Sequence, residues 1–199
     1  MNQVIVAITG ASGAAYGLRL IQRLANAGIK QHLLFSDAAR VVLKQELGLS
    51  LPEATEDVAA AIASHLDISD EFFSHYHQAD WFSPVASGSA GIRHMVVMPC
   101  SMGSLARIAG GISDNLIERA ADVILKERGD LILVPRETPL SSIHLEHMLK
   151  LSQMGVDLIP AMPGFYHRPE SIAELIDFMV DRVMDHLGVN DGEVQRWGD

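Results

Sequence analysis

Short, continuously apolar runs alternate with longer stretches in which apolar residues recur every three or four positions. The runs are typical of strands buried in a parallel sheet, and they predict strands at 4–8, 32–35, 72–75, 94–98, 131–134 and 156–159. The longer stretches have the spacing of amphipathic helices, which we expect at 14–27, 37–47, 55–64, 101–109, 114–127, 141–154 and 169–187. Because strands alternate with helices without a repeat or a polar linker, the pattern predicts one α/β domain with a mainly parallel sheet.

Two expectations concern the borders of these elements. Pro99 is expected to end the strand at 94–98, since proline has no N–H for the ladder. The domain is expected to span residues 1–189, and the polar tail, 190–199, to close on the functional site.

The unusual segments of the chain all follow predicted strands. Glycines, serines, prolines, charges or aromatic residues gather after positions 8, 35, 98, 134 and 159. In open parallel sheets, ligands bind beyond the carboxyl ends of the strands. The sequence therefore predicts one composite site at that edge of the sheet.

Composition and charge narrow the class of partner. The net charge is −10 over 199 residues, which argues against a nucleic acid or an anionic membrane surface but not against a small phosphorylated ligand. The single cysteine, Cys100, favours a reducing compartment. We find no signal-peptide pattern and no run of about 20 apolar residues, so we expect a cytoplasmic protein without a membrane span.

Two strand-to-helix turns are candidates for binding an anion or a ring. The first, 9–17, reads Thr-Gly-Ala-Ser-Gly-Ala-Ala-Tyr-Gly, in which Gly10 and Ser12 offer close backbone approach and a hydroxyl donor. The second, 99–104, reads Pro-Cys-Ser-Met-Gly-Ser, and Cys100 in it is interpreted as a buried small side chain rather than a nucleophile. For both turns, a purely structural or capping role stays open.

Three charged or aromatic groups carry further candidate chemistry. Arg119 and Lys126 are seven residues apart, so they share one helix face about 10 Å apart and could grip a phosphate. Arg136 and Glu137 follow a strand between two prolines, where arginine suits a flavin or phosphate oxygen and glutamate suits proton transfer. The alternatives are solvated ion pairs for both groups.

Tyr166 and Arg182 form the third group, since a phenol and a guanidinium can hold a phosphate together. The alternative for Tyr166 is an aromatic side chain that fills a gap under a loop. The loop 87–91, with Ser87 and Gly88, is either a ligand cover or a linker. The nine histidines lack a metal-binding pattern, so no metal site is expected.

Taken together, these segments resemble the flavin prenyltransferases of the UbiX family. The resemblance runs from Val4 to about Trp197 and rests on the order and spacing of its motifs. These motifs are Thr-Gly-Ala-Ser-Gly-Ala (9–14), Ala-Ser-Gly-Ser (86–89), Pro-Cys-Ser (99–101), Asn-Leu-Ile-Glu-Arg-Ala-Ala-Asp-Val (115–123), Leu-Lys-Glu-Arg (125–128), Val-Pro-Arg-Glu (134–137), Ser-Ser-Ile-His-Leu-Glu (141–146) and Pro-Gly-Phe-Tyr-His (163–167).

The resemblance implies a single-domain, three-layer Rossmann-like fold of the flavodoxin-like, flavin-containing cysteine decarboxylase type. It also implies reduced FMN and dimethylallyl phosphate as ligands, no metal, and a homo-oligomer, typically a dodecamer, with interfacial active sites. The FMN-binding residues would be Gly10, Ala11, Ser12, Ser36, Ser101, Met102, Gly103, Ser104 and Arg136. The donor-binding residues would be Tyr166, Arg182, Lys126, Ser87, Gly88 and Arg119, with Arg119 and Glu46 contributed across subunit boundaries.

The implied reaction joins the dimethylallyl carbon to N5 and then to C6 of reduced FMN as phosphate leaves. Ser12, Glu46 and Glu137 would handle protons, Arg119 and Lys126 would stabilise the phosphate, and Trp81 would stabilise an allylic cation. The product would serve a UbiD-type decarboxylase in ubiquinone biosynthesis or aromatic acid metabolism. Asp37 is one departure, beside the second strand, and it could alter flavin phosphate affinity.

Three other functions were weighed against this one. An NAD(P)-dependent oxidoreductase could use the 9–13 turn, but no tyrosine has a lysine four residues on. A flavin-dependent cysteine decarboxylase on the same scaffold should carry an asparagine-bearing loop, which 86–89 lacks. A flavin storage protein would have no shared use for Glu137, Lys126, Tyr166 and Arg182.

Overall fold

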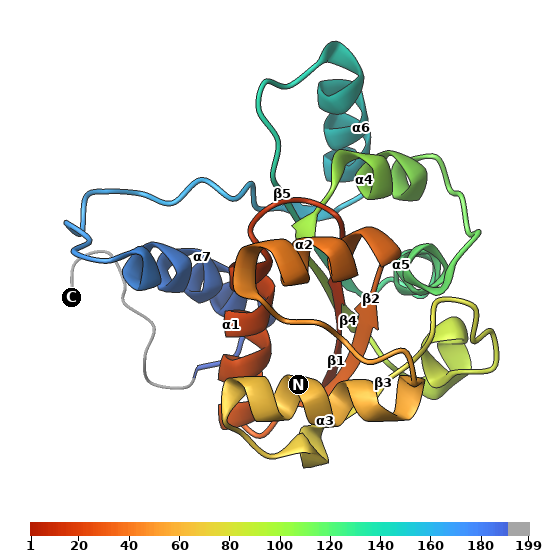
Figure 1. Cartoon of the computed structure of the whole chain (residues 1–199). Helices are drawn as coiled ribbons and strands as arrows, with labels where there is room; N and C mark the ends of the chain where they lie inside the picture. Colours follow the sequence, from red (N-terminus) through yellow and green to blue (C-terminus); the bar gives the residue numbers. More distant parts are fainter. Residues whose placement is uncertain (191–199) are drawn as a thin grey trace.

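The computed structural model describes residues 1–190 and consists of one parallel sheet between two layers of helices (Figure 1). The six strands have the order β3-β2-β1-β4-β5-β6, and every neighbouring pair is parallel. They are β1 (Gln3–Ile8), β2 (Lys30–Phe35), β3 (Phe73–His75), β4 (His94–Cys100), β5 (Asp130–Pro135) and β6 (Asp157–Leu158). This is the doubly wound Rossmann order, with its switch point between β1 and β4, and it confirms the predicted fold class.

The helices lie close to where their hydrophobic spacing predicts them. They are α1 (Ala14–Asn26), α2 (Asp37–Leu47), α3 (Thr55–Leu66), α4 (Met102–Ala109), α5 (Leu116–Lys126), α6 (Ser142–Gln153) and α7 (Ile172–Leu187). Polar caps define several of these borders: the Ser36, Ser101, Asn115, Ser141 and Ser171 side chains each accept a hydrogen bond from a backbone N–H of their own helix.

Alternate residues of β1 enter two separate cores. Val4, Val6 and Ile8 pack with α1, α2, α3 and α7, whereas Ile5 and Ala7 pack with α4 and α5. This two-sided burial explains why the strand is continuously apolar. Figure 1 shows α1 and α7 on one side of the sheet and α5 on the other.

Three borders differ from the sequence-based prediction. β4 does not end at Met98 but continues to Cys100, because the register shifts between Val97 and Cys100 and pairing resumes opposite Pro135. β6 is only two residues long. α7 begins at Ile172 rather than at 169, because Ser171 caps it by accepting a hydrogen bond from the backbone N–H of Glu174. The proposed tail 190–199 lies outside the described residues except for its first residue.

Helix α6 carries large apolar side chains that the rest of the chain does not cover. Ile143, Leu145 and Leu149 are 60%, 53% and 60% exposed, and Leu151 is the one buried residue of the helix. In Figure 1, α6 and α4 project from the body of the domain. Large apolar side chains gathered on one exposed helix are typical of a protein–protein interface.

Candidate functional site

A buried threonine joins the first two predicted turns. The hydroxyl of Thr9 donates to the carbonyl oxygen of Pro99 (3.0 Å) and accepts from the backbone N–H of Ser101 (2.7 Å). The backbone N–H of Thr9 donates to the same carbonyl (3.2 Å). Thr9 therefore fixes the end of β1 against the end of β4, at the switch point of the sheet. The sequence pattern places Thr9 only in a glycine turn and gives no signal for this contact.

Replacing Thr9 by valine is expected to destabilise the protein by about 1–3 kcal/mol, because the Ser101 N–H would lose its acceptor inside the fold. The shape of the side chain would be nearly unchanged. Thermal unfolding of the purified variant measures the loss, and Thr9→Ser, which keeps the hydroxyl, should recover most of it. Equal unfolding of the valine variant and the wild type would contradict this role.

The first turn brings backbone close to its neighbours. A Cβ at Gly10 would lie 2.5 Å from the Cβ of Ala38, so only glycine fits there without a shift. Ser36 caps α2, its hydroxyl accepting from the Ala39 N–H (3.0 Å), while its own N–H donates to the Ile8 carbonyl (3.1 Å). Gly10, Ala11, Ser12 and Ser36 thus occupy adjoining strand ends, as expected.

The second turn opens α4 with paired hydroxyls. Ser101 Oγ accepts from the Ser104 N–H (3.2 Å) and donates to Ser104 Oγ (3.1 Å). Met102 is buried against the core, whereas a Cβ at Gly103 would meet nothing within 4 Å. The turn thus combines fixed hydroxyls with open space, a combination that a flat ligand can use.

Arg136 reaches back across the sheet to the first turn. Its Nε donates to the Ser12 carbonyl oxygen (3.2 Å), and its backbone N–H donates to the Cys100 carbonyl (3.3 Å). Glu137 instead accepts from the backbone N–H of Thr138 (2.9 Å). Within residues 1–190 Arg136 and Glu137 form no ion pair with each other, so the alternative of a mutual surface pair is not observed.

Glu46 lies at the amino end of α1 in its own chain. Its carboxylate accepts from the N–H groups of Gly13 (3.0 and 3.2 Å) and Ala14 (3.0 Å). Burial raises the pKa of this carboxyl, but hydrogen bonds from Ser12, Gly13 and Ala14 and the charge of Arg136 lower it further, so the net pKa lies below its usual range. Glu46 is therefore ionised at neutral pH, and these contacts stabilise its charged form.

Within the chain, two backbone N–H groups at the start of α1 hold the Glu46 carboxylate. The last turn of α2 therefore reaches the first turn of α1. Sequence spacing alone does not indicate this approach. The expected action of Glu46 across a subunit boundary stays a prediction.

A second group of predicted residues gathers around α5. Arg119 donates from Nε to the Ala86 carbonyl (3.1 Å) and from Nη1 to Asp122 (3.0 Å), and Lys126 Nζ donates to Glu127 (2.8 Å). The backbone of Gly88 packs directly against the Glu127 side chain. Ser87, Gly88, Arg119 and Lys126 therefore lie together, and we refer to them as the α5 group.

Lys126 also borders a hollow of about 370 Å³ between α4, α5 and α6, together with Lys150. None of the residues of the first two turns lines it.

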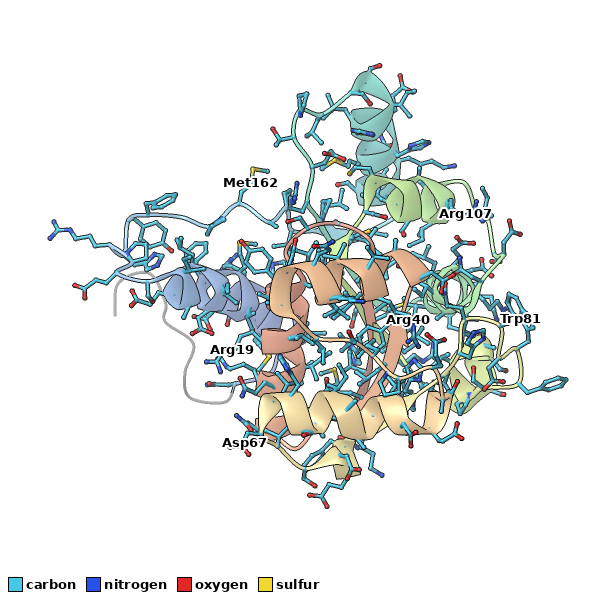
Figure 2. All side chains as sticks on the ribbon, viewed as in Figure 1. Arg19, Arg40, Asp67, Trp81, Arg107 and Met162 are labelled. Atoms are coloured by element: carbon cyan, nitrogen blue, oxygen red, sulfur yellow. The ribbon has the colours of Figure 1, made fainter. Side chains whose placement is uncertain are left out.

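Trp81 is 46% exposed and belongs to the loop that leads past α5, since the Gln78 carbonyl accepts from Leu116 N–H (2.8 Å) (Figure 2). In Figure 2 it lies at the α5 side of the molecule.

A third group consists of one residue on α7 and one in the loop before it. The Tyr166 ring meets the Phe178 ring edge-on, with centroids 5.7 Å apart, and Arg182 follows Phe178 by one helical turn. Arg182 also lies 3.8 Å from Asp185. We refer to Tyr166 and Arg182 as the α7 group. The ring contact does not exclude the alternative of a gap-filling tyrosine, although Tyr166 is 58% exposed.

The α5 group and Arg136 lie at opposite ends of β5. Lys126 precedes the strand and Arg136 directly follows it, and six residues of strand span about 16 Å between first and last Cα. One chain therefore gathers the four strand-end turns with Glu46, but it does not bring Lys126 to them. The predicted single composite site is divided within the chain.

Four further observations concern Cys100, metal binding, Asp37 and the helices. Complete burial raises the pKa of the Cys100 thiol to about 12, so it is not a thiolate nucleophile at neutral pH. No group of three or more His, Cys, Asp or Glu side chains within residues 1–190 could hold a metal ion. Asp37 accepts from Gln78 (2.9 Å), which gives it a structural partner. None of the helices that the structure describes is long and apolar enough to cross a membrane.

Comparison with known proteins adds a family. The Flavoprotein family model matches residues 1–184. The chain is 46% identical over 198 residues to a flavin prenyltransferase UbiX from Pseudomonas aeruginosa, covering 100% of this chain and 95% of that protein. It is 48% identical over 194 residues to a flavin prenyltransferase UbiX from Halalkalibacterium halodurans, covering 98% and 92%.

Solved structures agree with the sequence relatives. AnUbiX (PadA1) in complex with FMN and dimethylallyl pyrophosphate superposes with a TM-score of 0.87 at 37% identity, covering 100% of this chain and 98% of that one. A dodecameric FMN-dependent UbiX-like decarboxylase from Escherichia coli O157:H7 gives 0.86 at 40% identity, covering 99% and 100%. A PPC decarboxylase mutant at 18% identity, with a TM-score of 0.65, shares the fold alone.

Proposed function

This chain belongs to the UbiX flavin prenyltransferases, and from that premise we propose that it transfers a dimethylallyl group from dimethylallyl phosphate to N5 and C6 of reduced FMN. It is a transferase that acts on FMN, and the alternative of a flavin-dependent decarboxylase is not favoured. The observation that carries the residue assignment is the convergence of four strand-end turns at one edge of the sheet, with Lys126 held apart from them.

The strand-end turns fit FMN. The close approach at Gly10, the hydroxyls of Ser36, Ser101 and Ser104 and the Arg136 guanidinium together offer backbone, hydroxyl and cationic donors to a phosphate and a ring system. When bound in its reduced form, FMN supplies the nucleophilic nitrogen and ring carbon. Gly10, Ala11, Ser12, Ser36, Ser101, Met102, Gly103, Ser104 and Arg136 would hold it.

The chain's own residues divide the remaining work. Ser12 belongs to the first flavin turn and the Glu46 carboxylate adjoins it, and the two would handle protons there. Glu137 would be a further proton-handling group at the end of β5. Arg119, Lys126, Tyr166 and Arg182 would hold the phosphate as it departs, and the Trp81 ring would stabilise the allylic cation.

Because one chain does not bring the two parts of the predicted site together, we propose that two subunits form it jointly. Lys126 can meet Arg136 only if α5 of one subunit approaches the strand ends of another. The exposed apolar side chains of α6 support such an assembly, and we propose a dodecamer. We further propose that a UbiD-type decarboxylase receives the product, in ubiquinone biosynthesis or aromatic acid metabolism in the cytoplasm.

Anaerobic incubation with reduced FMN and dimethylallyl phosphate, followed by mass spectrometry of the extracted flavin, tests the reaction. A flavin heavier by one C5 unit is the expected result. Dimethylallyl diphosphate in a parallel reaction identifies the donor that is used. Unmodified FMN with both donors, from protein that binds FMN, would contradict the proposed reaction while leaving the fold and family unaffected.

A further inference from the structure

The side chain of His167 has an unusual environment. Both of its ring nitrogens are buried, and neither has a hydrogen-bond partner in the part of the chain that the structure describes. Buried polar atoms in proteins are nearly always hydrogen-bonded, and the exceptions often mark a ligand or a second chain. In the sequence, His167 is only the last residue of the motif at 163–167, and no role for it is expected from that position.

Two aromatic rings hold His167 in place. Its imidazole stacks on Phe178, with centroids 5.1 Å apart and planes 5° from parallel, and it meets Tyr166 edge-on at 5.6 Å. The backbone of Gly164 closes the cluster, because a Cβ there would lie 3.0 Å from Tyr166 and 3.1 Å from Phe178. The ring stack therefore buries both ring nitrogens of His167 and leaves them without hydrogen-bond partners among the described residues.

Two residues in or near the cluster carry groups that can bind an anion. Tyr166 adjoins His167, and Arg182 lies one turn beyond Phe178 on α7. Imidazole always has at least one N–H donor, and phosphate oxygens are strong acceptors. A charge-assisted hydrogen bond is worth more than one ring stack, so an anion can draw the imidazole away from Phe178.

Building on the proposed function, we infer that His167 is a further residue of the donor site and donates a ring N–H to the phosphate of dimethylallyl phosphate, beside Tyr166 and Arg182. As the carbon–oxygen bond breaks, its electron pair moves to the departing phosphate oxygen. The hydrogen bond from His167 becomes stronger as that negative charge grows. The histidine keeps its proton throughout.

The test replaces His167 by phenylalanine, which keeps the ring stack and removes both nitrogens. We expect kcat/KM for dimethylallyl phosphate to fall about ten- to hundredfold, with FMN affinity unchanged and a melting temperature that does not fall. His167→Gln restores a donor without the ring and should recover part of the loss. His65→Phe, the same change on the exposed surface of α3, serves as the matched control.

Inorganic phosphate provides a measurement that does not depend on the prenylation step. Its dissociation constant, from phosphorus NMR of the FMN-bound protein, should rise by a similar factor in His167→Phe and not in His65→Phe. Wild-type kcat/KM and phosphate binding in His167→Phe would overturn the inference, as would a change confined to oligomer dissociation. If phosphate binding weakens in His167→Phe but the wild-type protein forms no prenylated flavin, the result would instead count against the proposed reaction alone.

Discussion

Replacing Lys126 by alanine is expected to lower kcat/KM for flavin prenylation by about 10²–10³-fold, the usual cost of losing one charge-stabilising donor. FMN affinity should stay at the wild-type value, because Lys126 precedes β5 whereas the flavin turns follow the strand ends. Single-turnover formation of the heavier flavin and a separate FMN titration measure the two quantities. Lys126→Arg, which keeps the charge but not the shape, should fall between alanine and wild type.

The matched control for this variant is Lys150→Ala. Lys150 is an exposed cation that borders the same hollow as Lys126, but it has no place in the proposed site. It should therefore leave prenylation unchanged. Loss of FMN binding in Lys126→Ala would contradict the separation of the two groups, and full activity in it would remove Lys126 from the phosphate site.

Mixed oligomers of two inactive variants are expected to regain activity. Arg136→Ala disables the flavin turns of its own chain, and Lys126→Ala disables its own α5 group. If each site takes one face from each of two subunits, random mixing restores about a quarter of the wild-type sites. Co-expression with two affinity tags, followed by activity measurement on the doubly purified oligomer, gives the result.

The chain offers a control pair for this experiment. Arg119 and Lys126 lie on one helix, so every α5 group in a mixture of Arg119→Ala and Lys126→Ala lacks one cation. That mixture should regain nothing. If the Arg136→Ala and Lys126→Ala mixture also regained no activity, a single chain would have to supply both groups. That result would contradict the separation of about 16 Å that β5 places between them, at about 3.3 Å per residue.

The periodicity of the sequence determined the fold class and nearly every element. Apolar runs such as 4–8 and 131–134 are strands because both faces of the sheet are covered, and this requirement is visible residue by residue. Helix α2 has the predicted bounds, 37–47, because Ser36 caps one end and Gly48 ends the other in the left-handed conformation. These signals are local, so a single sequence is sufficient to identify them.

The identity of the strand-end residues was also determined by the sequence. In a parallel α/β sheet, whatever follows β1, β2, β4 and β5 must meet at one edge, so the proximity of Gly10, Ser36, Ser101 and Arg136 follows from topology. The predicted end of β4 at Met98 failed because a shift in register accommodates Pro99. Such a shift depends on the neighbouring strand and not on the proline itself.

Contacts between distant side chains were decided only by the tertiary structure. Thr9 bonding to Ser101, Glu46 lying on the α1 amino end and His167 stacking on Phe178 each join residues 11 to 92 positions apart. The division of the predicted site between the two ends of β5, in contrast, is already visible in the chain order, because Lys126 precedes the strand and Arg136 follows it. The hydrophobic pattern fixes which face of a helix is buried, whereas the packing angle and register of the helices fix which polar groups meet.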